Sequence, residues 1–100
     1  MRLFKNAISQ SLSVDKKMRV LGFVKKEESN VVVVYSKKNE CAQYNHIIMI
    51  SRRMGGVPLI RSEDRKVNSD GENNSIPIPA SVLPLITKKI KANGWDVISV

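Results

Sequence analysis

Cysteine and histidine are nearly absent from this 100-residue sequence, which contains one of each. A lone cysteine, Cys41, cannot form a disulfide within the chain, and this is typical of proteins from a reducing, intracellular compartment. Cys41 and the one histidine, His46, are too few ligands for a zinc site. Gly55 and Gly56 are not followed by the lysine and helix of a phosphate-binding loop. We therefore expect neither a metal nor another cofactor.

Long apolar runs are also missing. None approaches the roughly 20 residues that span a bilayer, and the N-terminus lacks the continuous apolar block of a secretory signal. We expect a cytoplasmic or nuclear protein, but residues 1–14 are acid-free like organelle transit peptides, so organelle import stays open. The interpretation that we favour for residues 1–15 is a short amphipathic helix or arm, with Leu3, Phe4, Ala7, Ile8 and Leu12 on one side.

Acidic residues are scarce relative to basic ones. Seventeen Lys and Arg outnumber nine Asp and Glu, which leaves a net charge of +8. Such a field attracts polyanions and repels other copies of the same chain. Nucleic acid is the first partner to consider, and an acidic protein or an anionic membrane surface is the alternative.

The length and the turn signals predict one α+β domain that spans residues 1–100. We expect a small antiparallel sheet of four to five strands, a short N-terminal helix, and a C-terminal amphipathic helix packed on one face. The polar stretch 62–75 reads as a long exposed loop or an extended hairpin tip. The expected strands cover residues 18–24, 31–35, 46–53 and 57–61, with 75–79 as an edge strand and 96–100 as a final strand.

The clearest helix signal lies between residues 81 and 94. Ser81 can cap this helix, Pro84 falls in its first turn, and Asn93-Gly94 supplies a left-handed stop. We expect Trp95, just beyond the stop, to cover the core. The apolar stripe consists of Val82, Leu83, Ile86 and Ile90, and the basic residues favoured by the dipole at the C-terminal end are Lys88, Lys89 and Lys91.

Basic residues come in adjacent pairs, most of them near the ends of the expected strands. Alternation along a strand places the two members of a pair on opposite faces, where they can contact a phosphate backbone. Lysine at a strand end also keeps a sheet edge soluble, which is the alternative interpretation. In a meander, one end of the sheet would gather Lys16-Lys17, Lys37-Lys38 and Arg65-Lys66, and the other Lys25-Lys26 and Arg52-Arg53.

Two tyrosines extend this hypothesis. Tyr35 and Tyr44 flank the connection that contains Lys37 and Lys38, and their rings could stack with unpaired bases. The alternative is that both rings pack in the core with their hydroxyls in water.

Catalytic patterns are weak. Asp64-x-Lys66 is half of the carboxylate and lysine arrangement of magnesium-dependent nucleases, and it needs a second carboxylate from another strand. Nucleophilic catalysis by Cys41 would need His46 beside it in space. We therefore expect a protein that is not an enzyme, with a nuclease as the less favoured alternative.

The segments HIIMISRRMGGVPLIRSEDRK and NNSIPIPASVLPLITKKI, within residues 44–91, show a strand with a basic end, a glycine turn, a second strand, a polar loop and an amphipathic helix. This order resembles the single-stranded-DNA-binding domain of the transcriptional positive-coactivator family, which is related in fold to the Whirly proteins. The resemblance implies a dimer in which a curved sheet holds unwound strands. It further implies backbone contacts from Arg52, Arg53, Arg61, Arg65 and Lys66, and a dimer helix whose partner faces Val82, Ile86 and Ile90.

Taken together, the sequence predicts a basic, non-enzymatic nucleic-acid-binding protein, favouring single strands of DNA or RNA and forming a homodimer. The alternative is a small structural or protein-interaction domain, such as a virus-encoded one, whose basic surface meets an acidic partner or a membrane.

Overall fold

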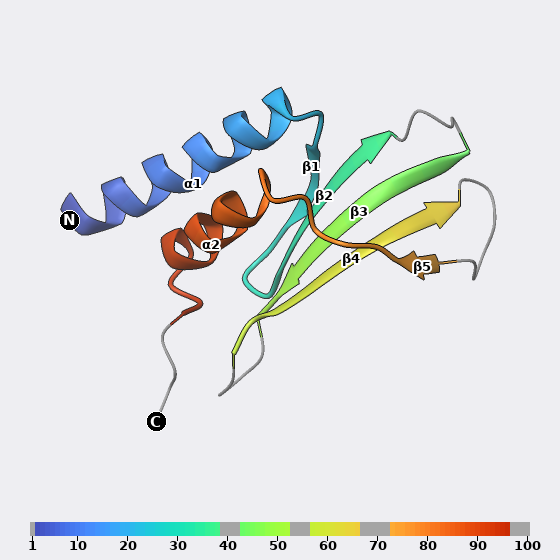
Figure 1. Cartoon of the computed structure of the whole chain (residues 1–100). Helices are drawn as coiled ribbons and strands as arrows, with labels where there is room; N and C mark the ends of the chain where they lie inside the picture. The colour runs from blue at the N-terminus through green and yellow to red at the C-terminus, as the bar shows by residue number, and fades with distance from the viewer. Residues whose placement is uncertain (1, 39–42, 53–56, 67–72, 97–100) are drawn as a thin grey trace.

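The computed structural model describes residues 2–38, 43–52, 57–66 and 73–96, with the side chains of all of these except residues 2–8 and 73. The chain forms an α+β fold with one five-stranded sheet (Figure 1). All neighbouring strands are antiparallel, and they follow one another in chain order. The elements are α1 (Arg2–Val20), β1 (Val24–Glu28), β2 (Val32–Lys38), β3 (Tyr44–Ser51), β4 (Leu59–Lys66), β5 (Asn73–Ser75) and α2 (Leu83–Ala92).

The two helices lie side by side on one face of the sheet, and the core fills the space between these layers (Figure 1). Alternate residues of the central strands point toward the helices, among them Val33 and Tyr35 on β2 and Ile48 and Ile50 on β3. The helices contribute the rest of this cluster, chiefly Val14, Met18, Val82, Leu85 and Ile86. The predicted antiparallel α+β fold with a helix packed on one face is therefore confirmed.

Both helices end in the same way, with a glycine in the left-handed conformation. Gly22 has φ 94° and Gly94 has φ 71°. In α1 the Phe23 N–H donates to the Met18 carbonyl and the Gly22 N–H to the Arg19 carbonyl, and α2 repeats this pattern before Trp95. These are Schellman motifs, which satisfy the last carbonyls of a helix. The predicted strand at 18–24 is wrong, because Gly22 ends a helix there and does not interrupt a strand.

Other predicted boundaries also need correction. Much of the stretch 62–75 belongs to strands β4 and β5, so the extended-hairpin interpretation is correct for the described residues and the long-loop interpretation is wrong. Residues 76–79 are not a strand, although the Ile76 N–H still bonds the Ser62 carbonyl. Val82, and not Ser81, is the N-cap of α2. Residues 97–100, most of the predicted final strand, lie outside the described residues.

The apolar stripes of both helices differ from the predicted ones. Leu12 is 55% exposed and Leu83 is 48% exposed. Val82 and Ile86 are each 1% exposed within a single chain, and Ile90 packs against the same core. These three side chains are therefore covered by their own protomer and do not form the exposed dimer surface that the resemblance implied.

Candidate nucleic-acid interface

No helix in the described part of the chain covers the second face of the sheet, which we call the open face (Figure 1). Its centre is apolar: the half-buried Val34 on β2 is paired with the half-buried Met49 on β3, and Ile47, two residues before Met49 on the same face, is buried. Met49 is paired in turn with Arg61 on β4, which is exposed. The open face thus combines an apolar strip with a cation at its side.

A polar row crosses the open face at the end of the sheet where β2 and β4 finish. Lys38 on β2 is paired with Asn45 on β3, and Asn45 is paired with Arg65 on β4. Lys38 and Arg65 lie two strand spacings apart, which corresponds to about 10 Å between their backbones. Two cations with an amide between them can contact successive phosphates of a chain that runs across the strands.

A groove of about 360 Å³ adjoins this row at the beginning of β1. We call it the lysine groove; its lining consists of Gly22, Val24, Lys26, Ser36, Lys37, Lys38 and Asn45, none of which is acidic. A β-bulge between Lys25 and Glu27 displaces Lys26 from the regular alternation. The Lys37 ammonium lies 5.6 Å from the centroid of the Phe23 ring, which holds the side chain by a cation–π contact. Three lysines are thus brought to one concave site.

One acidic side chain beside the row, Glu63, is already paired. Glu63 lies on the open face and accepts a hydrogen bond from Arg65 Nη2 at 2.9 Å. The Glu63 side chain is 10% exposed and that of Arg65 is 45% exposed, so this pair presents mainly the guanidinium to solvent. The remaining N–H groups of Arg65 are left for an anion.

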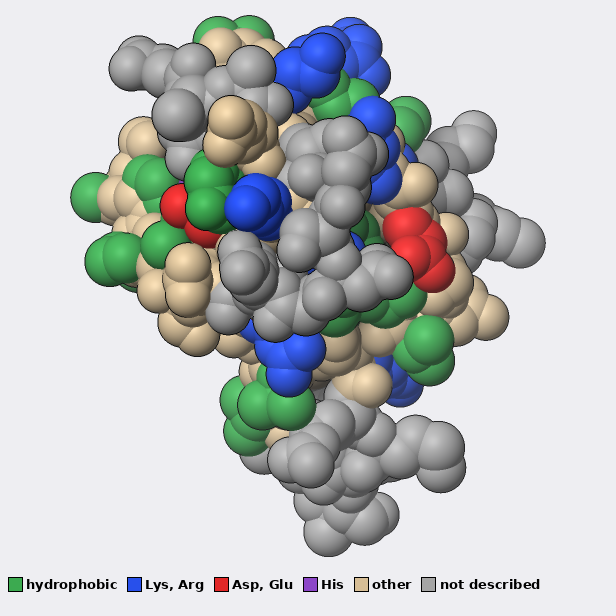
Figure 2. All heavy atoms as spheres, turned by 90° about the vertical axis from the view of Figure 1, so that its right-hand side faces the viewer, with side chains coloured by type: hydrophobic (Ala, Val, Ile, Leu, Met, Phe, Trp, Pro, Cys, Tyr) green, Lys and Arg blue, Asp and Glu red, His purple; other side chains and the backbone are tan. Residues whose placement is uncertain are grey.

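The structure places the predicted basic residues in several locations. Lys37-Lys38 and Arg65-Lys66 do lie at one end of the sheet, as predicted. Figure 2 looks onto this end and shows several Lys and Arg side chains on it, together with acidic side chains toward the sides of the view. Arg52 follows β3 at the opposite end, as predicted, but Lys16-Lys17 belong to α1 and Lys25-Lys26 lie inside β1, so these two pairs do not follow the predicted grouping. Arg53 lies outside the described residues.

The tyrosines do not form a stacking platform. Tyr35 is 1% exposed and its hydroxyl donates to Asp15 Oδ1 at 2.6 Å. Burial, together with this hydrogen bond to a carboxylate, raises the pKa of Tyr35 well above its usual value. Tyr44 is half-buried and is paired with Lys66 at the start of β3. The prediction that Tyr35 stacks on bases is therefore wrong.

A buried ion cluster between the helices and β1 was missed by the sequence reasoning. Lys89 on α2 is 0% exposed, and its ammonium donates to Asp15 Oδ1 at 3.0 Å, to Glu28 Oε1 at 2.8 Å and to Ser11 Oγ. Lys25 donates to Asp15 Oδ2 at 2.8 Å and to Glu28 Oε1 at 2.9 Å. The β-bulge in β1 shifts the alternation so that Lys25 and Glu28 both face the helices.

The cluster is balanced in charge, with two lysines against two carboxylates. Burial alone would raise the pKa of Asp15, but hydrogen bonds from Lys25, Tyr35 and Lys89 outweigh it and hold this pKa below its usual value. The pKa of Glu28 is lowered in the same way, against its own burial, by Lys89 and Lys25. The pKa of Lys25 is raised, because its two carboxylate partners outweigh desolvation. These groups fasten α1, α2 and β1 to one another.

One sequence signal for Lys89 was available. Position 89 follows Val82 and Ile86 by seven and three residues, and so lies on the same stripe of α2. The helix dipole, which favours cations at the C-terminal end, explains Lys88, Lys89 and Lys91 together in the sequence, and this explanation hides the place of Lys89 on the stripe.

The residues considered for catalysis are placed as follows. His46 Nε2 lies 2.7 Å from Ser62 Oγ, both residues are buried, and the imidazole packs edge-on against the Phe23 ring. Burial lowers the pKa of His46, which favours the neutral imidazole. We interpret this pair as a hydrogen-bonded core contact. Asp64 and Lys66 lie on β4, and no group of three or more metal-ligating side chains occurs among the described residues. Cys41 lies outside them.

Comparison of the chain with models of protein families, with curated proteins and with solved structures finds no match. In the part of the chain that the structure describes, no helix is both long and apolar enough to cross a membrane.

Proposed function

We propose that this protein binds nucleic acid, without catalysing a reaction on it, through phosphate contacts on the open face of the sheet. The observation that carries the proposal is the continuity of the lysine groove with the row Lys38, Asn45 and Arg65. Arg61 extends this cationic path along β4. A net charge of +8 adds a field that draws a polyanion toward the surface.

The centre of the open face favours a single strand over a duplex. The half-buried Val34 and Met49 form an apolar strip beside the cations, and unpaired bases can lie on such a surface while the phosphates reach Lys38 and Arg61. In a duplex the base faces are stacked inside and cannot use this strip. Because the strip offers no pattern of hydrogen bonds to base edges, the affinity should depend weakly on sequence.

Fluorescence anisotropy with a labelled single-stranded DNA, its duplex and the corresponding RNA, each across a salt series, tests this proposal. About five phosphate contacts, made by Lys26, Lys37, Lys38, Arg61 and Arg65, should give a slope of log affinity against log salt near −3.5 on a single strand. No binding at low salt would defeat the proposal, since the net charge alone should give some association.

Two double variants, each of which removes two positive charges, show which surface binds the nucleic acid. Lys38→Gln with Arg61→Gln changes two exposed side chains on the open face, whereas Lys16→Gln with Lys17→Gln changes two exposed side chains on α1. We expect the first to reduce the magnitude of the salt slope by about 1.4 and the second to change it little. Equal effects of the two variants would show that only the total charge matters.

A second candidate function rests on exposed apolar residues at the opposite end of the sheet, where Leu59 and Ile60 lie on opposite faces of β4. Three apolar side chains are exposed at this end: Val31 (56%), Leu59 (50%) and Ile60 (38%). The Arg52 N–H donates a hydrogen bond to the Val31 carbonyl, which holds Val31 beside the end of β3. Exposed apolar residues that lie together mark contact sites for other proteins. Leu59→Ser should leave oligonucleotide binding unchanged and should weaken any self-association seen by light scattering.

A further inference from the structure

The two helices form a layer whose outer surface, which faces away from the sheet, is basic. α1 contains one acidic residue, Asp15, and its carboxylate points inward to Tyr35 and Lys89. α2 contains no acidic residue. Four exposed cations, which we call the helix-layer lysines, are Lys16 and Lys17 on α1 and Lys88 and Lys91 on α2. The positive charge of this surface is therefore not balanced within either helix.

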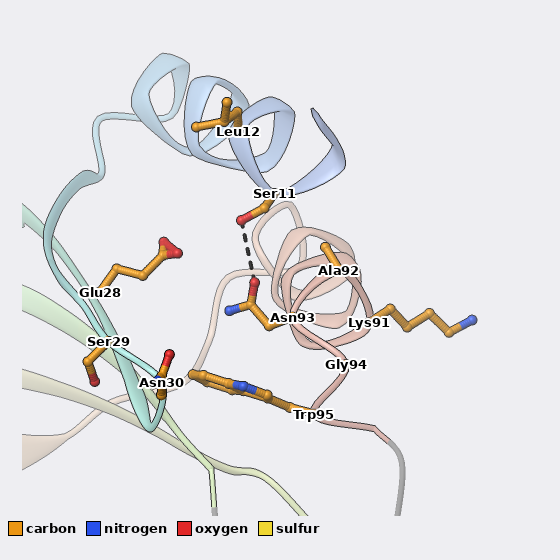
Figure 3. Close-up of a pocket in the computed structure, with 10 residues that line it drawn as sticks. All are labelled: Ser11, Leu12, Glu28, Ser29, Asn30, Lys91, Ala92, Asn93, Gly94 and Trp95. Carbon is orange, nitrogen blue, oxygen red and sulfur yellow. Dashed lines mark hydrogen bonds between the residues drawn. The ribbon is translucent and has the colours of Figure 1, made fainter. Parts of the chain in front are cut away.

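The buried side chains show that these lysines point outward. Met18 faces the core, and Lys16, two residues away, lies on the opposite side of α1 because each residue turns a helix by about 100°. On α2, Lys91 extends away from the sheet and from the hydrogen bond that joins Ser11 to Asn93 (Figure 3). The basic surface is thus the one that the helix layer presents to its surroundings.

A shallow groove of about 200 Å³ lies between the helices on this surface. Its lining consists of Lys17, Lys88 and Lys91 with Gln10, Ser13 and Val14, none of which is acidic. Three ammonium groups around one groove repel one another, and an anionic group placed among them relieves this repulsion. The groove is large enough for a single anionic headgroup.

Exposed apolar side chains accompany the lysines. Val20 is 86% exposed, and it follows Lys16 and Lys17 by four and three residues, so it shares their side of α1. Leu83, the first residue of α2, is 48% exposed and lies at the same end of the layer, because α1 ends beside the start of α2 (Figure 1). The surface therefore combines cations with apolar contacts at one end.

From these observations we propose that the outer surface of the helix layer docks on an anionic membrane surface. The helix-layer lysines contact the charged headgroups, and Val20 reaches the boundary between the headgroups and the acyl chains. Lysine stems can extend along apolar surface while their ammonium groups stay among the headgroups. The open face lies on the other side of the sheet, so this inference does not depend on nucleic-acid binding.

Two features favour a membrane over other polyanions. All four cations of the surface are lysine, which is depleted at protein interfaces, whereas arginine is enriched there. A phosphate backbone offers little apolar surface to Val20, whereas a bilayer offers acyl chains directly below its charged groups.

Cosedimentation of the full chain with lipid vesicles tests the proposal. One set of vesicles contains phosphatidylcholine alone, and the other contains equimolar phosphatidylcholine and phosphatidylserine. We expect binding to the second set only. Lys88→Gln with Lys91→Gln should weaken this binding by about 25-fold, which is about fivefold for each lysine.

The matched control is Lys38→Gln with Arg61→Gln, which removes the same charge from the open face. Screening by salt over the thickness of the molecule should limit its effect on vesicle binding to less than about threefold. Val20→Ser leaves the charge unchanged and should weaken vesicle binding by about threefold. All five positions are exposed, so the melting temperatures should stay the same.

Four results would overturn the proposal. The first is no binding to the anionic vesicles, and the second is an equal loss in the two double variants, which would show that only total charge matters. The third is full binding by Val20→Ser, which would exclude the apolar contact. The fourth is a loss of oligonucleotide binding in the Lys88 and Lys91 variant with unchanged vesicle binding, which would assign the helix layer to nucleic acid.

Discussion

Replacing Lys89 with methionine tests the buried ion cluster most directly. Methionine keeps the length of the lysine stem and removes its charge. Lys89 is 0% exposed and contacts both Asp15 and Glu28, so its loss leaves two buried or half-buried carboxylates with one lysine between them. Removing one partner from a buried ion pair costs about 3 to 5 kcal/mol. Because Lys25 and the Tyr35 hydroxyl still donate to these carboxylates, we expect the lower end, about 3 kcal/mol.

Urea denaturation followed by circular dichroism measures this loss. With a slope of about 1.5 kcal/mol per molar urea, the midpoint should fall by about 2 M. Such a loss is a large part of the stability of about 5 to 15 kcal/mol of a typical domain. Lys88→Met is the matched control, because it changes the same residue type in the same helix at an exposed position, and it should alter the stability by less than about 0.5 kcal/mol.

A second change shows whether charge balance is the cause. Lys89→Met leaves Lys25 facing two carboxylates, and adding Glu28→Gln restores one positive charge against one negative charge. The double variant should therefore be more stable than Lys89→Met alone. Equal midpoints for Lys89→Met and Lys88→Met, or a double variant that is less stable than Lys89→Met, would refute the reasoning from the cluster.

Three further perturbations test other parts of the fold. Hydrogen bonds lower the pKa values of Asp15 and Glu28 in the folded protein. These two carboxylates therefore stabilise the fold fully at a pH above their unfolded pKa values of about 4, and this stabilisation is lost as the pH falls through their lower folded pKa values. Thermal melts should show a steep loss below about pH 4, and a melting temperature that is constant from pH 5 to pH 2 would contradict this. Gly22→Ala places a β-carbon 3.1 Å from a lysine side chain at φ 94°. In urea it should cost more stability than Gly94→Ala, which also lies in the left-handed region, at φ 71°, but has nothing within 4 Å of the added β-carbon. Equal costs would show that neither the close contact nor the larger φ of Gly22 matters. Ile86→Asp should abolish folding because this side chain is 1% exposed, whereas a soluble variant with unchanged melting would remove α2 from the core.

The sheet was predictable from the sequence to the extent that alternation and turn residues determined it. The central strands β2 and β3 contain the apolar runs around Val33 and Ile48, as the sequence predicts. The polar residues after Ser62 continue β4, although the sequence allowed a loop there equally well. The polarity of β4 misleads because it lies near the edge of the sheet and one of its faces is open. The choice between a strand and a loop after Ser62 depends on strand pairing, which involves residues distant in the chain.

The predicted strand at 18–24 is wrong for a physical reason, which a comparison with the end of α2 shows. A glycine after an amphipathic stretch ends α1 with the same pair of hydrogen bonds that Gly94 uses to end α2. The signal was recognised at Gly94, where it follows a strong apolar stripe. Before Gly22 the stripe alternates with polar residues of the buried cluster, such as Ser11 and Asp15, so apolar periodicity alone underestimates the helix.

The buried cluster also bears on the proposed interface, because it withdraws acidic groups from the surface of a basic protein. Asp15 and Glu28 direct their carboxylates toward Lys89 and away from the open face, and Glu63 is paired with Arg65. Three of the nine acidic residues are therefore neutralised locally, and the field around the lysine groove is opposed by fewer free carboxylates than the composition implies. Stability depends on ion pairs on the helix side, whereas the proposed phosphate binding would depend on cations of the other face. Mutations on the two sides should therefore have separable effects.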